Sequence, residues 1–256
     1  MEFECIVYQK QGGVAEIRLN RPRVLNAMNK QLWLDVQAAL EDARLDPEIK
    51  AVIFTGEGRA FSTGADLKES KTRTPEEYRD YLEELQEASR RIIRFEKPTI
   101  AAVNGYALGS GYELALACDI RIAAEEAVIG SPEARVTSSV TGGAMRLVQE
   151  LIGPGKACEL LFTAEYIDGK EAERIGLVNR AVPLETLMDE ARRIAEAIAR
   201  NSSFSVKMIK KGLQMAREGV SLEALMDYEV EACLACVFTK EREESLQAFE
   251  DRKKGD

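Results

Sequence analysis

Hydrophobic and polar residues form strand-like and helix-like patterns in turn over the first third of the chain. Alternation over residues 5–8 and Val14–Leu19, on either side of the glycine pair 12–13, predicts a β-hairpin. Apolar positions at helical spacing predict a helix over residues 26–45, and the apolar run at residues 51–55 predicts a buried strand. This succession of strands and helices is typical of an α/β fold.

A second helix is predicted from its start signals. Thr74 is a typical N-cap residue, and Pro75 with the acidic residues after it is typical of a first helical turn. The helix should end before Pro98. Its apolar stripe is expected to comprise Tyr78, Leu82, Leu85, Ser89 and Ile92.

The middle of the chain predicts a further unit of strand, turn and helix. Residues 99–103 form another apolar run, and residues 104–111 contain several glycines. A short helix of small apolar residues is expected over residues 113–118, followed by strands at residues 119–123 and 127–129.

Helical patterns dominate from about residue 147 onward. Long amphipathic helices are predicted over residues 185–200, 205–218 and 222–238, and residues 177–182 could form a short strand. We therefore expect an α/β fold with a core over residues 1–195 and a helical region over residues 196–256. Because the helical region has little core of its own, it should pack on the core or on a neighbouring subunit, which predicts an oligomer.

Composition narrows the classes of function. The 256 residues include no histidine, which excludes nucleophile systems based on Ser-His or Cys-His and zinc sites based on histidine. The formal net charge is −9 and no basic cluster is evident, so nucleic-acid binding is not expected. No apolar stretch approaches the roughly 18 residues of a membrane helix, and residues 1–10 lack a signal core, so we expect a cytoplasmic protein.

The five cysteines are expected to be reduced residues of a cytosolic core rather than disulfides. Cys233 and Cys236 are spaced like a metal-binding pair, but the chain has neither a second such pair nor a histidine. We therefore predict that they pack on one helix face and that the protein holds no metal.

Two glycine-containing turns could bring backbone N–H groups to a ligand. Residues 59–67 and 104–114 each follow a buried strand and lead toward a helix. The unpaired N–H groups at the start of the second helix could hold a developing oxyanion. Glycines also make ordinary tight turns, so neither turn establishes a site by itself.

Two glutamates lie near the second turn in the sequence. Glu113 falls in the first turn of the short helix, and Glu133 follows Ser131 and Pro132 after the next strands. Two carboxylates beside an oxyanion site could transfer protons next to a carbonyl group. The alternative is that Glu113 caps its helix dipole and Glu133 is a surface charge in a loop.

Short motifs along nearly the whole chain, from about residue 3 to about residue 254, add more than spacing does. They are Asn20-Arg-Pro-x-x-Leu-Asn-Ala27, Phe61-x-x-Gly-Ala-Asp-Leu-Lys68, Lys97-Pro-x-Ile-Ala-Ala-Val-Asn-Gly105, Gly109-x-Gly-x-Glu-Leu-Ala-Leu-Ala-Cys-Asp-Ile120, Pro132-Glu133, Gly142-Gly143, Arg146-Leu147, Leu151-Ile-Gly153 and Gly176-Leu-Val-Asn179. By their order and spacing the sequence resembles the crotonase superfamily, the enoyl-CoA hydratase/isomerase family.

This resemblance implies a spiral of ββα turns with C-terminal helices at a trimer interface, often in a dimer of trimers. It implies an acyl-CoA thioester as substrate, with coenzyme A present only as part of that substrate and no cofactor or metal. The backbone N–H groups of Ala65 and Ser110 would form the oxyanion hole.

The resemblance also implies a substrate groove. Arg252 falls where the family has a lysine that can reach the CoA phosphates from an adjacent subunit. The other implied substrate-binding residues are Val24, Leu25, Asn26, Ala27, Phe61, Ser62, Thr63, Gly64, Asp66, Leu67, Gly109, Gly111 and Pro132.

Glutamates at both family positions favour hydration of a 2-enoyl-CoA, or the reverse dehydration. Glu113 would orient and deprotonate the water and Glu133 would transfer a proton at the α-carbon, although the two could also share both roles. Another crotonase-type enzyme, such as a double-bond isomerase or a lyase on a polar or cyclic acyl-CoA, is the first alternative. The second is a binding protein without catalysis.

The sequence departs from the family pattern at three places. Ser110 replaces a glycine, which would be strained if the position requires a positive φ. Tyr112 replaces a small residue and could either pack or donate a hydrogen bond near Glu113. The loop at residues 134–141 is rich in Ser and Thr, lacks the usual Pro-Gly element and should shape the acyl pocket; its Ser and Thr could also be solvated turn residues.

Overall fold

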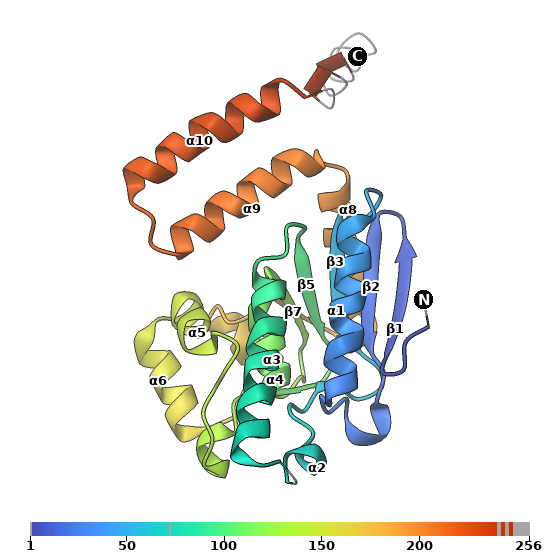
Figure 1. Cartoon of the computed structure of the whole chain (residues 1–256), viewed down its shortest axis with the longest axis vertical. Coiled ribbons are helices and arrows are strands. Elements are labelled where there is room, and N and C mark those ends of the chain that lie inside the picture. The colour runs from blue at the N-terminus through green and yellow to red at the C-terminus, as the bar shows by residue number, and fades with distance from the viewer. Residues whose placement is uncertain (1, 72, 240–241, 244–245, 248–256) are drawn as a thin grey trace.

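The computed structural model describes residues 2–71, 73–239, 242–243 and 246–247, and its main feature is a six-stranded sheet (Figure 1). β1 pairs antiparallel with β2, and all later pairings in this sheet are parallel. The predicted hairpin at the glycine pair 12–13 is therefore confirmed. The strands, in sheet order, are β1 (Ile6–Gln11), β2 (Val14–Leu19), β3 (Ala51–Gly56), β5 (Thr99–Val103), β7 (Ile120–Ala124) and β9 (Arg180–Val182).

A second, smaller sheet lies beside the first, and sequence analysis anticipated only its last strand, which was predicted over residues 127–129 and lies at Ile129–Gly130. It consists of the parallel strands β4 (Ala60–Ser62), β6 (Tyr106–Leu108) and β8 (Ile129–Gly130). β4 and β6 fall inside the segments predicted as plain turns, at residues 59–67 and 104–114. Strands of three residues are too short to display an alternating pattern, so no periodicity signals β4 or β6.

The first helix starts later than predicted. A short 3-10 helix (Pro22–Val24) precedes it, and α1 covers Lys30–Leu45 with Asn29 as its N-cap, accepting a hydrogen bond from the N–H of Leu32. Leu25 and Asn26 have positive φ values of 53° and 56°, which no helix accommodates. Helical spacing of apolar residues does not reveal this turn.

The second long helix, α3 (Pro75–Ile93), starts as predicted. Thr74 and Glu77 form a capping box, in which each side chain accepts a hydrogen bond from the other residue's N–H. The predicted apolar stripe is wrong at one position, because Tyr78 is exposed and Tyr81 is buried in its place. Leu85, Ser89 and Ile92 are buried as expected.

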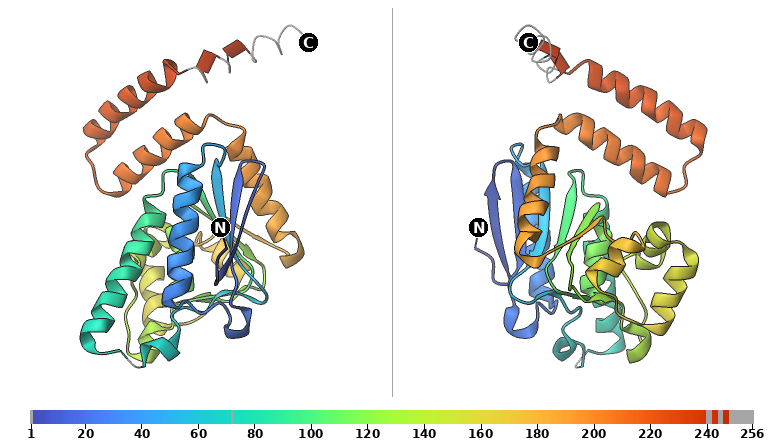
Figure 2. Two further views of the ribbon diagram at one scale, coloured as in Figure 1. Left: turned by 45° about the vertical axis from the view of Figure 1, so that its right-hand side comes forward. Right: turned by 180° about the vertical axis from the view of Figure 1, so that it is seen from behind.

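Helices lie against both faces of the large sheet. α8 packs against one face through Leu187, Ala191 and Ala195, while α1, α3 and α4 belong to the main core on the other face (Figure 2). α4 begins three residues before the predicted start at residue 113. The bounds are α2 (Leu67–Ser70), α4 (Ser110–Ala117), α5 (Ala144–Ile152), α6 (Pro154–Thr163), α7 (Gly169–Arg174) and α8 (Leu187–Ala199), with 3-10 helices at Glu133–Val136 and Leu184–Thr186.

The last two long helices, α9 (Ser203–Arg217) and α10 (Leu222–Val237), form an antiparallel pair beyond one end of the sheet (Figure 1). α9 is attached to the core through Lys210, whose ammonium group lies 2.6 Å from Asp119 Oδ2 and 2.9 Å from the carbonyl oxygen of Lys97. The division of the chain at residues 195–196 remains a prediction. Large exposed apolar residues on the pair and at its end are Ile209, Leu213, Leu222, Met226, Val230, Leu234, Val237 and Phe238.

The prediction of five core cysteines is correct for only two. Cys5 and Cys118 are buried, but Cys158 and Cys233 are exposed and Cys236 is half-buried. Cys158 lies on α6, and Cys233 and Cys236 lie on α10. The apolar residues around them belong to helix faces that are exposed in the single chain. No helix of the described part of the chain is long and apolar enough to cross a membrane.

Candidate active site

The loop before α1 is held by the side chain of Asn26. This fully buried amide donates to the carbonyl oxygens of Glu57, at 3.0 Å, and Ala60, at 2.7 Å, and accepts from the N–H of Arg21 at 2.8 Å. All the hydrogen bonds that the structure records for this side chain are made with backbone groups. Asn26 therefore fixes residues 21–27 against the β3–β4 connection, and a ligand at this loop would meet its backbone and its neighbours.

The segment after β4 leaves one backbone donor unused. The N–H of Met28 donates to the carbonyl oxygen of Gly64 at 2.8 Å, and the N–H of Asp66 donates to the carbonyl oxygen of Met28 at 3.1 Å. These two hydrogen bonds form a parallel bridge between Met28 and Ala65, but they are made by Gly64 and Asp66, the residues on either side of Ala65. Within the described ranges, the N–H of Ala65 has no protein acceptor.

The turn before α4 supplies a second unused donor. Gly109 precedes the helix with φ 53°, a conformation that suits glycine, and Ser110 is the first helical residue. Ser110 is not one of the described non-glycine residues with positive φ, so the strain considered for it does not arise. Its N–H has no acceptor among the residues that the structure describes, as expected at a helix start.

Glycines bring the two turns together. A Cβ atom on Gly64 would lie 3.1 Å from the nitrogen of Ser110, and one on Gly111 would overlap the carbonyl oxygen of Ser62. Because the backbones are in direct contact, the N–H groups of Ala65 and Ser110 lie in neighbouring segments. Phe61 and Ser62 are fully buried at this contact, so their side chains support the turns.

Glu113 is a buried carboxylate with two hydrogen bonds from one residue. The N–H of Thr141 donates to Oε1, and the Thr141 hydroxyl donates to Oε2 at 2.7 Å. Burial raises the pKa of Glu113, the two hydrogen bonds from Thr141 lower it, and the negative charge of Glu133 raises it. Glu113 therefore does not cap the start of its own helix.

Glu133 lies on the other side of the same turn. It begins the 3-10 helix after β8, and its Oε2 accepts a hydrogen bond from the Ser131 hydroxyl. A Cβ atom on Gly109 would lie 2.8 Å from Glu133 Oε1, so this carboxylate rests against the turn that leads into Ser110. The structure thus brings both predicted glutamates to one site.

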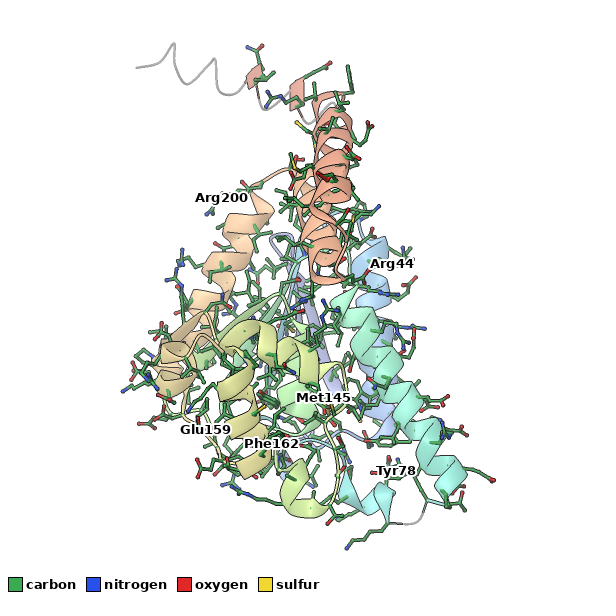
Figure 3. The ribbon with its side chains drawn as sticks, turned by 90° about the vertical axis from the view of Figure 1, so that its left-hand side faces the viewer. Arg44, Tyr78, Met145, Glu159, Phe162 and Arg200 are labelled. Carbon is green, nitrogen blue, oxygen red and sulfur yellow. The ribbon has the colours of Figure 1, made fainter. Side chains whose placement is uncertain are left out.

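A cavity of about 320 Å³ opens beside Glu133. The 134–141 loop contributes Ser138, Ser139 and Val140 to its wall, and its role in shaping an acyl pocket stays a prediction. Met145 from α5 and Phe162 from α6, two exposed apolar side chains on one face of the molecule (Figure 3), line it as well. The cavity is mainly apolar, with the carboxylate at one side.

Sequence reasoning missed three contributors to this site. Thr141 was expected only to shape a pocket. Neither Ser131 nor Gln86, whose Oε1 accepts a hydrogen bond from the N–H of Gly142 at 2.9 Å, was singled out. The hydrogen bonds of Thr141 depend on a turn that joins distant segments, which local patterns do not reveal. Tyr112 is buried in the main core, and burial raises its pKa, so packing is the correct interpretation of that departure.

The remaining substrate-groove candidates lie around the same two turns. Leu67 and Val24 are exposed on the surface, Asp66 forms an ion pair with Arg21 at 2.9 Å, and Thr63 donates through its hydroxyl to the carbonyl oxygen of Leu25 at 3.3 Å. Arg252 lies outside the described residues.

Comparisons with known proteins identify the family to which the chain belongs. A sequence model of the enoyl-CoA hydratase/isomerase family matches residues 9–256. The chain belongs to that family. Its fold is the α/β crotonase fold with a helical C-terminal region: the crystal structure of an enoyl-CoA hydratase from Bacillus anthracis matches it with a TM-score of 0.94 at 35% identity over 97% of each chain.

Two curated members of the family are similar over nearly their whole length. The short-chain-enoyl-CoA hydratase of Clostridium acetobutylicum is 36% identical over 255 residues, which cover 99% of this chain and 97% of that protein. The crotonyl-CoA hydratase of Syntrophomonas wolfei is 37% identical over 257 residues, covering 99% of this chain and 98% of that protein.

Proposed function

We propose that this member of the family is an enoyl-CoA hydratase that adds water reversibly across the 2,3 double bond of a short 2-enoyl-CoA. One observation carries the proposal: Glu113 and Glu133 flank the turn at Gly109 and Ser110, and the backbone N–H groups of Ser110 and of Ala65 in the adjacent segment have no acceptor among the described residues. Hydration needs a base for water, an acid for carbon and a site for the negative charge that develops between them.

The reaction divides between the two carboxylates. Glu113 accepts a proton from water as the water oxygen bonds to the electrophilic β-carbon. The electron pair of the 2,3 double bond moves into the bond between the α-carbon and the carbonyl carbon, and the carbonyl π pair moves onto the thioester oxygen, which gives an enolate. Glu133 then donates a proton to the α-carbon, and exchange with solvent restores both groups. The overall reaction is the addition of one water molecule, so electrons and atoms balance without a redox step. The thioester bond to coenzyme A stays intact throughout.

The enolate oxygen accepts hydrogen bonds from the N–H groups of Ala65 and Ser110. Donors of this kind each contribute a factor of about 10²–10³ in rate, since they are already oriented when the charge develops. Ser110 opens α4, so the positive end of the helix adds to the effect. Each positioned proton transfer contributes a further factor of about 10²–10⁴.

The acyl group enters the cavity beside Glu133. Its wall of Val140, Met145, Leu161 and Phe162 suits an apolar chain, and Ser138 and Ser139 add hydroxyl groups near the 134–141 loop. The CoA portion would run along the surface around Val24 and Leu67. There the backbone segments of residues 24–27 and 63–66 lie next to each other. A trimer or dimer of trimers and a cytoplasmic location remain predictions.

The test follows the absorbance of the conjugated thioester when crotonyl-CoA is mixed with the protein. We expect rapid loss of absorbance with the wild type. Glu113→Gln and Glu133→Gln should each slow it by about 10²–10⁴, because each removes a positioned proton transfer. Glu159→Gln, at an exposed glutamate of α6 (Figure 3), is the matched control and should match the wild type.

An isomerase predicts a different pattern in the same experiment. It would move a double bond without consuming water, and Glu133→Gln alone would abolish its activity. A binding protein without catalysis would leave the absorbance unchanged with every variant. Either result would contradict the proposed hydration.

A further inference from the structure

Both recorded hydrogen bonds to the carboxylate of Glu113 come from Thr141. The backbone N–H of Thr141 binds Oε1 and its side-chain hydroxyl binds Oε2, at 2.7 Å for the hydroxyl. With one donor on each oxygen, the plane of the carboxylate is fixed relative to α4. Each carboxylate oxygen keeps a second lone pair, which is free to accept a hydrogen bond from water.

The turn that carries Thr141 is itself held between two helices. The carbonyl oxygen of Thr141 accepts a hydrogen bond from the N–H of Ala144, the first residue of α5, at 2.9 Å. The N–H of Gly142 donates to Gln86 Oε1 on α3 at 2.9 Å. Gly142 has φ 61°, and a Cβ atom there would lie 3.3 Å from the Cβ of Glu113. The close approach of this turn to α4 therefore places Thr141 within reach of Glu113.

The charge of Glu113 makes this arrangement energetically important. The residue is 2% exposed, so ionisation of its carboxyl group costs solvation free energy, and Glu133 adds a second negative charge to the same site. Hydrogen bonds to an ionised group are about twice as strong as those between neutral groups. A hydroxyl donor at Thr141 thus favours the ionised carboxylate that a base for water requires.

We propose that Thr141 is a positioning residue, whose hydroxyl and N–H together hold the carboxylate of Glu113 in the orientation and ionised form that water activation requires. The proposal rests on the proposed hydration for its kinetic consequence. Its structural consequence, the control of Glu113 by the hydroxyl, does not depend on which reaction the site catalyses.

The experiment compares variants with and without the hydroxyl. Thr141→Val removes the hydroxyl and keeps the branched shape and the backbone N–H. Thr141→Ala removes both the hydroxyl and the branched side chain. Thr141→Ser keeps the hydroxyl and removes only the methyl group. Thr55→Val is the matched control, because it removes a buried hydroxyl bond of 2.9 Å to the carbonyl oxygen of Ala102 in the sheet. Glu113→Gln identifies the carboxyl signal of Glu113 in a ¹³C NMR titration of labelled full-length protein.

We expect the titration of Glu113 to move upward by about one to two pH units in Thr141→Val and Thr141→Ala, since one hydrogen bond to a charged group is worth that much. The acidic limb of kcat for crotonyl-CoA should move by the same amount. kcat and kcat/KM should fall together with KM unchanged, because the loss concerns the transition state. Thr141→Ser and Thr55→Val should keep the wild-type titration and pH profile.

An unchanged Glu113 titration in a folded variant without the hydroxyl would overturn the proposal. So would a kinetic loss in Thr141→Val that is independent of pH and is not restored by Thr141→Ser. If Thr141→Val does not fold, Thr141→Ala decides the question. If the wild type does not hydrate crotonyl-CoA, the proposed function fails, and the NMR titration alone decides whether Thr141 controls Glu113.

Discussion

Glu133 rests against Gly109, and no larger residue fits between them. A Cβ atom on Gly109 would lie 2.8 Å from Glu133 Oε1, and Gly109 has φ 53°. The carboxylate therefore lies directly against the glycine that leads into the first turn of α4. This contact places an acid group beside the N–H of Ser110, which the proposed reaction uses.

Replacing this glycine should affect activity much more than folding. In Gly109→Ala the new methyl group displaces Glu133 and strains the turn, and displacement of a catalytic group by about 1 Å can cost about 10²-fold in rate. We expect kcat/KM for crotonyl-CoA to fall by about that factor. Gly155→Ala, where a Cβ atom meets nothing within 4 Å, is the control and should keep full activity. Equal activity of the two variants would contradict this account of the contact.

The buried charge of Glu113 should lower the stability of the native state near neutral pH. Since burial raises the pKa of Glu113 in the folded state, the folded protein binds the proton more tightly than the unfolded chain. The contribution of Glu113 to stability is thus fully present below the ordinary glutamate pKa and is lost as pH rises through the raised value. At pH values above the raised pKa, each pH unit between the folded and unfolded pKa of a group lowers the free energy of unfolding by about 1.4 kcal/mol.

Glu113→Gln should therefore be more stable than the wild type at pH 7.5, with the gain disappearing near pH 4. Urea unfolding at both pH values measures the difference. Glu41→Gln provides a control of opposite sign, because Arg44 lowers the pKa of the exposed Glu41. A gain for Glu113→Gln that is equal at both pH values would show that charge is not the cause.

Asn26 should be important for stability through its buried amide. Asn26→Asp places a carboxylate oxygen against the carbonyl oxygens of Glu57 and Ala60, which now accept from the amide. An unpaired buried charge costs about 3–5 kcal/mol, so urea unfolding should detect a loss of that size. Asn201→Asp, at the exposed end of α8, should cost less than about 1 kcal/mol. Similar losses in both variants would argue against the structural role of Asn26.

The exposed apolar residues of α9 and α10 should be covered by other subunits. Val230 is 58% exposed and Phe238 is 85% exposed, although both are large apolar residues. We expect light scattering to give the mass of a trimer or a hexamer for the wild type and a smaller mass for Val230→Lys. Glu83→Lys on α3 should leave the mass unchanged. A monomeric wild type would show that the predicted assembly is wrong.

Much of the fold could be predicted because long elements have strong periodic signals. The hairpin at the glycine pair 12–13, the cap at Thr74 and the strand at Thr99–Val103 are all where the sequence places them. Asn26 was assigned to a helix because apolar spacing does not reveal a positive φ. The strands β4 and β6 escaped notice because they are only three residues long.

The site could be predicted only in part. Glu113 and Glu133 were found through residue type and family motifs, and the structure brings them to the same turn. Thr141 could not be assigned to Glu113, because their contact joins residues 28 positions apart through a turn held by Gln86. Such a pairing depends on the packing of α3, α4 and the loop, which no local pattern encodes.

The most direct test of the central claim is the mass of the product formed from crotonyl-CoA in ¹⁸O-labelled water. The account predicts a product that has gained one labelled water, formed rapidly by the wild type and slowly by both Glu113→Gln and Glu133→Gln. A product of unchanged mass with a moved double bond would contradict hydration. Rapid labelling by either glutamine variant would contradict the joint action of the two carboxylates.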